Sequence, residues 1–157
     1  MFKDGTINDV VVKNLQRFGD QRGWLCELFR EDEIEGKYMP VMCYISVTRA
    51  GIARGPHEHT DQSDYFCFLG PSDFKLYLWD NRPQSPTYLA RQIVVGGETN
   101  PISVIVPPGV VHAYRNIGTI DGTVVNCANR LYRGERKQFS IDEIRHEEDP
   151  DTIFRLD

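Results

Sequence analysis

The sequence has no excess of positive charge and no long apolar run. Its 18 Lys and Arg residues are outnumbered by 23 Asp and Glu residues, for a formal net charge of −5. Nothing therefore marks the whole surface for nucleic acid or for an anionic membrane. No segment approaches the roughly 20 apolar residues of a membrane span, and the first residues lack the layout of a signal peptide. We expect no nucleic-acid and no membrane partner.

Cysteine and histidine are both scarce. The chain has four cysteines, spread without a CxxC pair among apolar or strand-forming residues. This pattern is typical of buried free thiols in a reducing compartment and predicts a cytoplasmic protein. Only four histidines are present, and three of them fall in two short segments. The cysteines are Cys26, Cys43, Cys67 and Cys127.

The apolar segments are short, and glycine or proline turns separate them. With 157 residues the chain is long enough for one domain with a sizeable core, and we expect a single domain over residues 1–157. Short strands with turn signals every 8–12 residues or so predict an all-β barrel or sandwich. Two polar stretches, 31–38 and 140–149, predict only short peripheral helices. Strands are expected near 10–15, 24–29, 41–48, 65–69, 74–80, 93–95, 102–106, 110–116 and 123–126.

Two segments carry three of the histidines. The first reads Gly51-Ile-Ala-Arg-Gly-Pro-His57-Glu-His59-Thr-Asp-Gln-Ser-Asp64, and the second runs from Pro107 to Asn116 through His112. On a strand, side chains two apart share a face. His57 and His59 should therefore point the same way, and two such strands facing each other would bring the three histidines into one pocket.

These two segments resemble the paired motifs of the cupin superfamily. The first matches the Gly-x5-His-x-His pattern, with Asp64 where cupins usually carry Glu, and the second matches Pro-x-Gly-x2-His-x3-Asn. The resemblance implies an all-β, cupin-type double-stranded β-helix (jelly roll) with short peripheral helices. Because the edges of such sheets must be paired or covered, we expect a homodimer.

A longer resemblance runs from residue 20 to residue 150. Six segments in order are similar to motifs of the dTDP-4-dehydrorhamnose 3,5-epimerase family. They are Asp20-Gln-Arg22-Gly23 through Glu27, Arg54-Gly-Pro-His57, Asp80-Asn-Arg82 through Tyr88, Pro107-Pro-Gly109 through Tyr114, Leu131-Tyr132, and Asp142 through Pro150. The resemblance implies a metal-free epimerase acting on a nucleotide-diphospho-4-keto-6-deoxy sugar, in deoxysugar or surface-polysaccharide synthesis.

The resemblance also implies roles for individual residues. His57 would be the base that removes a proton beside the C4 ketone, and Tyr132 the acid that returns one from the other face. Arginines would bind the diphosphate, since guanidinium groups match phosphate geometry. The expected substrate-binding residues are Arg22, Glu27, Arg54, His59, Gln62, His112 and Arg115.

Departures from the family leave two alternatives open. The Lys that the family carries after its Gln is replaced, because Gln62 is followed by Ser63 and Asp64. A related 3,4-ketoisomerase also fits the Arg-Gly-x-His-x-His pattern. A divalent metal is the other alternative, since three imidazoles and a carboxylate suit a transition metal. That set is His57, His59, Asp64 and His112.

The end of the chain contributes little to this prediction. The family's late Asp, which partners its catalytic histidine, has no counterpart before residue 157. The charged run from Asp142 to Asp149 is interpreted as a solvated face, and His146 within it is expected to lie outside the site. A cupin that binds a sugar nucleotide without turning it over is the third hypothesis.

Overall fold

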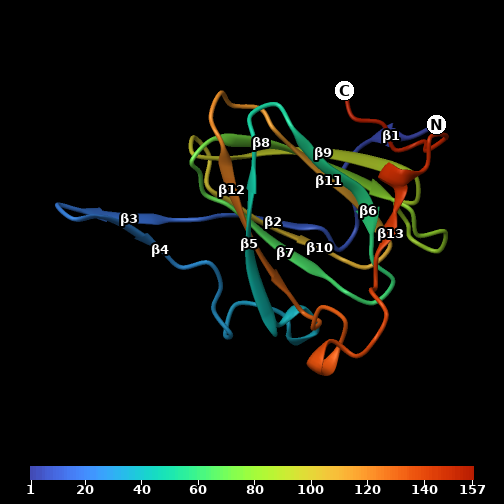
Figure 1. The fold of residues 1–157 in the computed structure, drawn as a ribbon, viewed down its shortest axis with the longest axis horizontal. Helices are drawn as coiled ribbons and strands as arrows, with labels where there is room; N and C mark the ends of the chain where they lie inside the picture. The colour runs from blue at the N-terminus through green and yellow to red at the C-terminus, as the bar shows by residue number, and fades with distance from the viewer.

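The protein consists of two packed β-sheets and a hairpin that extends away from them (Figure 1). The computed structural model describes residues 1–157, and the predicted all-β fold is confirmed. One sheet has six strands in the order β1-β9-β8-β11-β6-β13, and the other has five in the order β2-β10-β7-β12-β5. The first comprises β1 (Lys3–Asp4), β9 (Ala90–Gly97), β8 (Asp73–Asp80), β11 (Val110–Asn116), β6 (Ala53–Glu58) and β13 (Ile144–Arg145). The second comprises β2 (Val11–Asn14), β10 (Ile102–Val106), β7 (Asp64–Phe68), β12 (Gly122–Ala128) and β5 (Met42–Thr48).

Strand β8 shows how the sequence pattern places the core. Phe74, Leu76 and Leu78 alternate along it and face the space between the sheets, where the largest buried cluster lies. Tyr77 and Trp79 point the other way and would be exposed, but the C-terminal Phe154 covers that face. Both faces of β8 are therefore buried.

A continuous run of aromatic rings fills the space between the sheets. Phe66 of β7 lies edge-to-face with Tyr114 of β11, and Tyr114 in turn contacts Phe68 and Phe74, with centroid separations of 5.7–5.8 Å. Phe66 also meets the ring of His112 at 5.4 Å. Edge-to-face pairs are worth about 0.5–1.5 kcal/mol each beyond burial, so the run fixes His112 against the core.

The peripheral helices are three short 3₁₀ turns. They are η1 (Gly36–Tyr38), η2 (Glu135–Lys137) and η3 (His146–Glu148). The prediction of a short helix over 140–149 is wrong. This stretch forms β13, which pairs with β6, and then the 3₁₀ turn η3. Pairing with the edge of β6 satisfies backbone groups that a helix would have bonded internally.

The cysteines are all free thiols, but they are not all buried. Cys67 and Cys127 are buried, Cys26 is half-buried and Cys43 is exposed. Cys43 is exposed because β5 is the last strand of its sheet. It lies directly opposite Cys127 on β12, with the two Sγ atoms 3.3 Å apart.

The hairpin, which we call the arm, is formed by β3 (Arg17–Asp20) and β4 (Gly23–Cys26). Its two strands pair only with each other, and the arm projects to one side of the domain (Figure 1). Three large apolar side chains on it, Phe18, Trp24 and Leu25, are more than half exposed. None of the helices is long and apolar enough to cross a membrane.

Candidate active site

Three histidines and one aspartate meet at one end of the space between the sheets. His57 on β6 lies directly opposite His112 on the neighbouring strand β11, with ring centroids 4.5 Å apart. His59 follows the end of β6, and Asp64 opens β7 in the other sheet. One ligand atom from each of the four side chains lies within 4.8 Å of all the others. The expectation that alternate positions would bring the three histidines together is met.

Gly55 allows the two histidine strands to approach each other. Its φ of +80° lies in the left-handed region, which favours glycine. A Cβ built there would lie 2.6 Å from the carbonyl oxygen of His112. Any side chain at this position would therefore separate β6 from β11 and displace His57 from His112.

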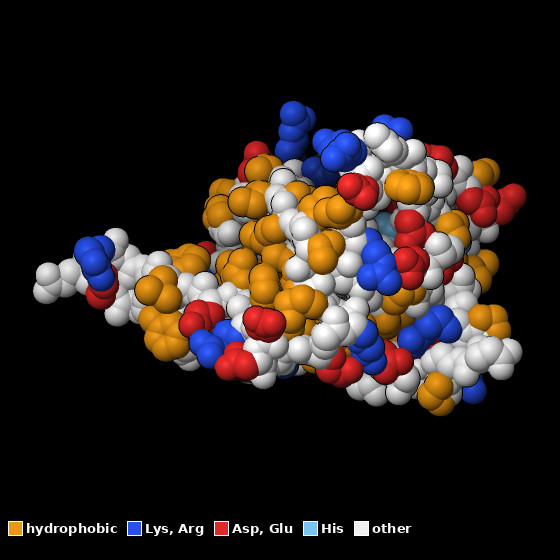
Figure 2. All heavy atoms as spheres, turned by 90° about the horizontal axis from the view of Figure 1, so that it is seen from below, with side chains coloured by type: hydrophobic (Ala, Val, Ile, Leu, Met, Phe, Trp, Pro, Cys, Tyr) orange, Lys and Arg blue, Asp and Glu red, His pale blue; other side chains and the backbone are white.

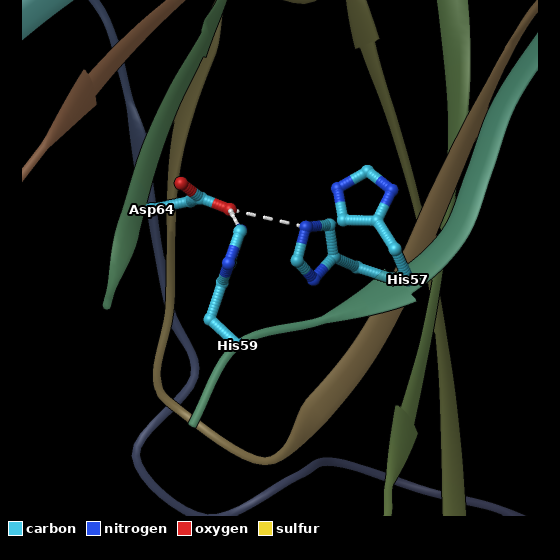
Figure 3. Close-up of side chains that lie close together, drawn as sticks. His57, His59 and Asp64 are labelled. Carbon is cyan, nitrogen blue, oxygen red and sulfur yellow. Dashed lines mark ion pairs between the residues drawn. The ribbon is translucent and has the colours of Figure 1, made fainter. Parts of the chain in front are cut away.

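Asp64 is the centre of the cluster. Its Oδ1 accepts hydrogen bonds from Gln62 Nε2 and Asn126 Nδ2, both at 2.8 Å. Its Oδ2 lies 3.2 Å from His59 Nε2 and 3.1 Å from His112 Nε2 (Figure 3). Burial alone would raise the pKa of Asp64, but the histidines hold it well below its usual range. In turn, although burial opposes it, the Asp64 carboxylate raises the pKa of His59 to about 9.

His57 lies beside this cluster and is electrostatically different from it. Burial, followed by the neighbouring His112, lowers the pKa of His57 to about 2, so its imidazole is neutral and holds a free lone pair. Two carboxylates flank the ring: Glu143 Oε1 is 3.9 Å from Nε2, and Glu147 Oε1 is 3.9 Å from Nδ1. An imidazolium formed by taking up a proton would be stabilised from both sides.

The segment 140–149 carries both glutamates and is tied to the site. The Asp142 carboxylate accepts backbone N–H bonds from Thr60, Asp61 and Gln62, each at 2.9 Å, and also the Thr60 hydroxyl. His146 Nε2 lies 2.8 Å from Glu58 Oε1 on the opposite side of β6. The interpretation of this charged run as a solvated face holds for Glu148 and Asp149, which are exposed, but not for Asp142 and Glu143, which are half-buried and turned toward residues 57–62.

A cavity of about 1180 Å³ opens in front of the cluster. Figure 2 shows a histidine recessed in a hollow, with acidic and basic side chains around it. His57, His59, Gln62, Arg54 and Tyr132 all line this cavity, as expected for site residues. His112 is only 1% exposed and lies behind them. His146 is not among the lining residues.

Three expected substrate-binding residues lie outside the cavity of their own chain, which corrects the prediction. Arg22 is at the tip of the arm, 90% exposed and paired with Asp20. Glu27 follows the arm and lies outside the cavity. Arg115 has the opposite parity to His112 on β11, so it faces outward and donates to the Asp157 carbonyl at 2.6 Å.

The structure adds functional residues that sequence reasoning missed. Nothing in the sequence assigns Glu143 and Glu147 to the site, because they lie in a uniformly charged run. Only the pairing of β13 with β6 brings them to His57. Three basic side chains after β12 also line the cavity: Arg130, Arg133 and Lys137. Their signal was the excess of Lys and Arg in residues 130–137.

Two further tyrosines share the cavity wall with Tyr132. The Tyr44 hydroxyl accepts a hydrogen bond from Asn126 Nδ2 at 2.9 Å, and burial raises its pKa to about 12. Tyr114 bonds Ser46 through its hydroxyl at 3.0 Å. Tyr132 is 47% exposed and Tyr44 46%, so both are accessible to a bound molecule, whereas Tyr114 is buried.

Residues 4–145 match the family described as dTDP-4-dehydrorhamnose 3,5-epimerase. Over 128 residues the chain is 37% identical to a probable low-salt glycan biosynthesis epimerase of Haloferax volcanii, covering 80% of this chain and 81% of that protein. Over 147 residues it is 30% identical to a spore coat polysaccharide biosynthesis protein of Bacillus subtilis, covering 94% and 93%.

The fold has a close counterpart among solved structures. A dTDP sugar isomerase from Desulfovibrio desulfuricans superposes with a TM-score of 0.78, covering 88% of this chain and 84% of that one. The two sequences are 18% identical, so this likeness concerns the fold.

Proposed function

The chain belongs to the dTDP-4-dehydrorhamnose 3,5-epimerase family and is a sugar epimerase, an isomerase, and we propose that it acts on a nucleotide-diphospho-4-keto-6-deoxy sugar. The observation that carries the proposal is His57. It presents a neutral imidazole between two carboxylates, in the wall of a cavity that also holds Tyr132 and Arg54. The names of the two relatives support a place in glycan or polysaccharide synthesis.

The reaction begins with proton removal at a carbon next to the C4 ketone. His57 takes this proton, and the C–H electron pair moves into the ring to form an enolate with its charge on the C4 oxygen. Glu143 and Glu147, on either side of the ring, stabilise the resulting imidazolium. Tyr132 then donates its hydroxyl proton to the opposite face of the carbon, while the electron pair returns from the C4 oxygen and restores the ketone. The His57 imidazolium releases its proton to solvent, and solvent reprotonates the phenolate. The configuration of that carbon is inverted.

The remaining polar groups divide between the sugar and the nucleotide. His59 and Gln62 line the cavity together with His57, which supports a role for them in binding the sugar. Arg54 is the expected phosphate ligand that faces the cavity, and Arg130 and Arg133 provide further guanidinium groups there. Their fork of N–H donors matches the geometry of a diphosphate.

We also propose that the enzyme is a homodimer in which the arm of one copy packs against β5 of the other. The arm exposes Phe18, Trp24 and Leu25, and β5 exposes Tyr44 and Ile45 along an edge with no neighbouring strand. Covering both removes apolar surface and an open sheet edge from water. Because β5 also lines the cavity, this packing brings Arg22 and Glu27 toward the site of the second copy.

The dimer has a direct test. Light scattering on a size-exclusion column should give twice the chain mass for the wild type. A variant with Trp24→Ser and Leu25→Ser should run as a monomer with an unchanged circular-dichroism spectrum. An exposed apolar pair elsewhere, Ile120 and Ile153, both changed to Ser, serves as the control. A monomeric wild type at micromolar concentration would refute the proposal.

A cytoplasmic location is also proposed, because all four cysteines are free thiols.

Isotope exchange tests the reaction itself. The enzyme is incubated with dTDP-4-keto-6-deoxyglucose in D₂O, and deuterium at C3 and C5 and the configuration of the product are followed by NMR. We expect deuterium at one or both carbons with inversion. His57→Asn should slow both by about 10²–10⁴-fold. No deuterium at either carbon would refute the proposal, and a 3-keto product would identify a 3,4-ketoisomerase.

The acid can be assigned in the same assay. Tyr132→Phe keeps the base but lacks the proton donor, so exchange through His57 should continue while inversion slows. Tyr44→Phe is the matched control, since its hydroxyl is in the same cavity but already bonded to Asn126. Loss of inversion in Tyr44→Phe alone would transfer the role of acid to Tyr44.

A further inference from the structure

Residues 144–148, which we call the strap, run along the edge of the six-stranded sheet and send consecutive side chains to opposite faces of β6. The strap consists of β13, which lies beside β6 (Figure 1), and the turn η3. Glu147 lines the cavity, with its Oε1 3.9 Å from His57 Nδ1. His146, the residue before it, reaches the other face of β6 and contacts Glu58. Two neighbours in one turn therefore act on the two faces of one strand.

The contact between His146 and Glu58 fixes the position of η3. The Glu58 side chain is 6% exposed, and its Oε1 lies 2.8 Å from both His146 Nε2 and Asn81 Nδ2. His146 is the only ion-pair partner of this buried carboxylate. The imidazole also packs on the ring of Phe154, with centroids 4.6 Å apart. Because removing one partner of a buried ion pair is costly, η3 is held to β6 at this point.

The two carboxylates beside His57 differ in their other partners. Glu143 Oε2 lies 2.8 Å from Arg145 Nε, so part of the charge of Glu143 is already neutralised. Glu147 has no Lys or Arg partner, and its one ion-pair contact is His57 Nδ1. A nearby unpaired anion favours a positive or N–H group more than a paired one does. Glu147 therefore has the stronger influence on the ring.

This difference determines which nitrogen of His57 carries the hydrogen. Nδ1 is buried and has no hydrogen-bond partner, and it faces the Glu147 carboxylate. A carboxylate repels a lone pair and attracts an N–H group. The hydrogen of the neutral imidazole is therefore favoured on Nδ1, and the lone pair on Nε2 is left to accept a proton. Once Nε2 takes up that proton, the imidazolium forms an ion pair with Glu147 through Nδ1–H.

We infer that Glu147 is the carboxylate that orients His57, and that His146, through its contact with Glu58, holds Glu147 in place. Both act through His57 and are positioning residues. The backbone of η3 carries both side chains, so a shift of His146 on Glu58 also moves Glu147 relative to His57 Nδ1. The effect on turnover rests on the proposed function, in which His57 is the base, whereas the tautomer of the ring does not.

The tautomer of His57 can be measured by NMR on the full chain labelled with ¹⁵N. Long-range correlations between ring protons and ring nitrogens distinguish Nδ1–H from Nε2–H, and single variants assign the four histidines. We expect Nδ1–H in the wild type. Glu147→Ala leaves Glu143 beside the ring at Nε2, so the hydrogen should move to Nε2. Glu148→Ala, at the next position, is the matched control and should keep Nδ1–H.

Turnover of dTDP-4-keto-6-deoxyglucose tests the role of His146. His146→Ala should lower kcat about 10–100-fold, since a misplacement of about 1 Å can cost about 100-fold, and KM should change little. His146→Gln keeps an N–H donor near the position of Nε2 and should restore most of kcat. Glu147→Ala should lower kcat at least as much as His146→Ala. Because His146 acts through Glu147, the double variant should be no slower than Glu147→Ala alone.

Three results would overturn the inference: Nε2–H at His57 in the wild type, Nδ1–H retained in Glu147→Ala, or losses of kcat in His146→Ala and Glu147→Ala that multiply in the double variant. No turnover by the wild type would overturn the proposed function, while the NMR experiment still tests the orientation of His57. Circular dichroism checks that each variant is folded, and the tautomer of the wild type stands even if a variant is not.

Discussion

Asp142 provides the sharpest test of how the site is assembled. Its carboxylate accepts three backbone N–H bonds and one hydroxyl bond from residues 60–62. Burial would raise the pKa of Asp142, but these bonds lower it from 3.8 to about 2. At about 1.36 kcal/mol for each pKa unit, a lowering of the pKa to about 2 corresponds to about 2 kcal/mol. Asp142→Ala should lower the free energy of unfolding by that amount or somewhat less, since the group is partly exposed.

The pH dependence follows from the direction of this shift. A group whose pKa is lower in the folded state stabilises the protein fully above its unfolded pKa and loses that effect as pH falls through the folded value. The difference between wild type and Asp142→Ala should therefore be constant from pH 8 to about pH 5. It should shrink by about 1 kcal/mol between pH 5 and pH 3.

Urea unfolding at several pH values measures this difference, and hydrogen exchange followed by mass spectrometry locates it. In Asp142→Ala, amides of residues 139–149 should exchange faster while those of β8 do not. Because Glu143 and Glu147 leave His57, kcat should fall more than KM changes. Asp151→Ala, in the same exposed stretch, is the matched control. A pH-independent difference, or unchanged exchange in 139–149, would refute the anchoring role.

Three further changes probe the scaffold. Gly55→Ala places a methyl group against His112 O and should reduce turnover about 100-fold. Gly51→Ala is the control, because Gly51 also has a positive φ but open space around it, and it should leave turnover unchanged. Equal effects of the two substitutions on turnover would show that the close approach of β6 and β11 is unimportant. Asp80→Asn should lower the free energy of unfolding by about 2 kcal/mol above pH 4 and by less near pH 3, as measured by acid unfolding curves. The reason is that hydrogen bonds from Arg82 and its neighbours overcome the effect of burial and lower the pKa of Asp80 to about 2. Trp79→Ala should cost about 3–5 kcal/mol in urea unfolding because Trp79 is 1% exposed; a loss under 1 kcal/mol would contradict the packing described.

The strands and the histidine cluster could be predicted because they depend on local pattern. Alternating apolar residues give β8 its core face, and the same period of two places His57 and His59 on one side. The turn after β8 is local in the same sense, because Arg82 Nε lies 2.8 Å from Asp80 Oδ1, two positions away. Each of these features is set by residues a few positions apart.

The predictions that failed concern contacts between segments that are far apart in the sequence. Nothing in the local sequence says that the arm leaves the domain, so Arg22 and Glu27 were placed in a cavity that they do not reach within one chain. Glu143 could not be assigned to His57 because the two are 86 positions apart, and only the β13–β6 pairing joins them. A charged run looks solvated until the backbone donors that it binds are known.

The packed aromatic rings beneath the cavity and the residues at its rim should differ in how readily they accept mutations. His112, Phe66 and Tyr114 are held edge to face within paired strands, so a change to any one disturbs the others. Between Tyr132 and Asp142, residues 133–141 are irregular backbone with mostly exposed side chains, and several of them line the cavity. Laboratory evolution toward new sugars should therefore accept mutations in 133–141 more readily than in the floor, so that a randomised library confined to those positions would yield more active variants than one spread over the whole gene.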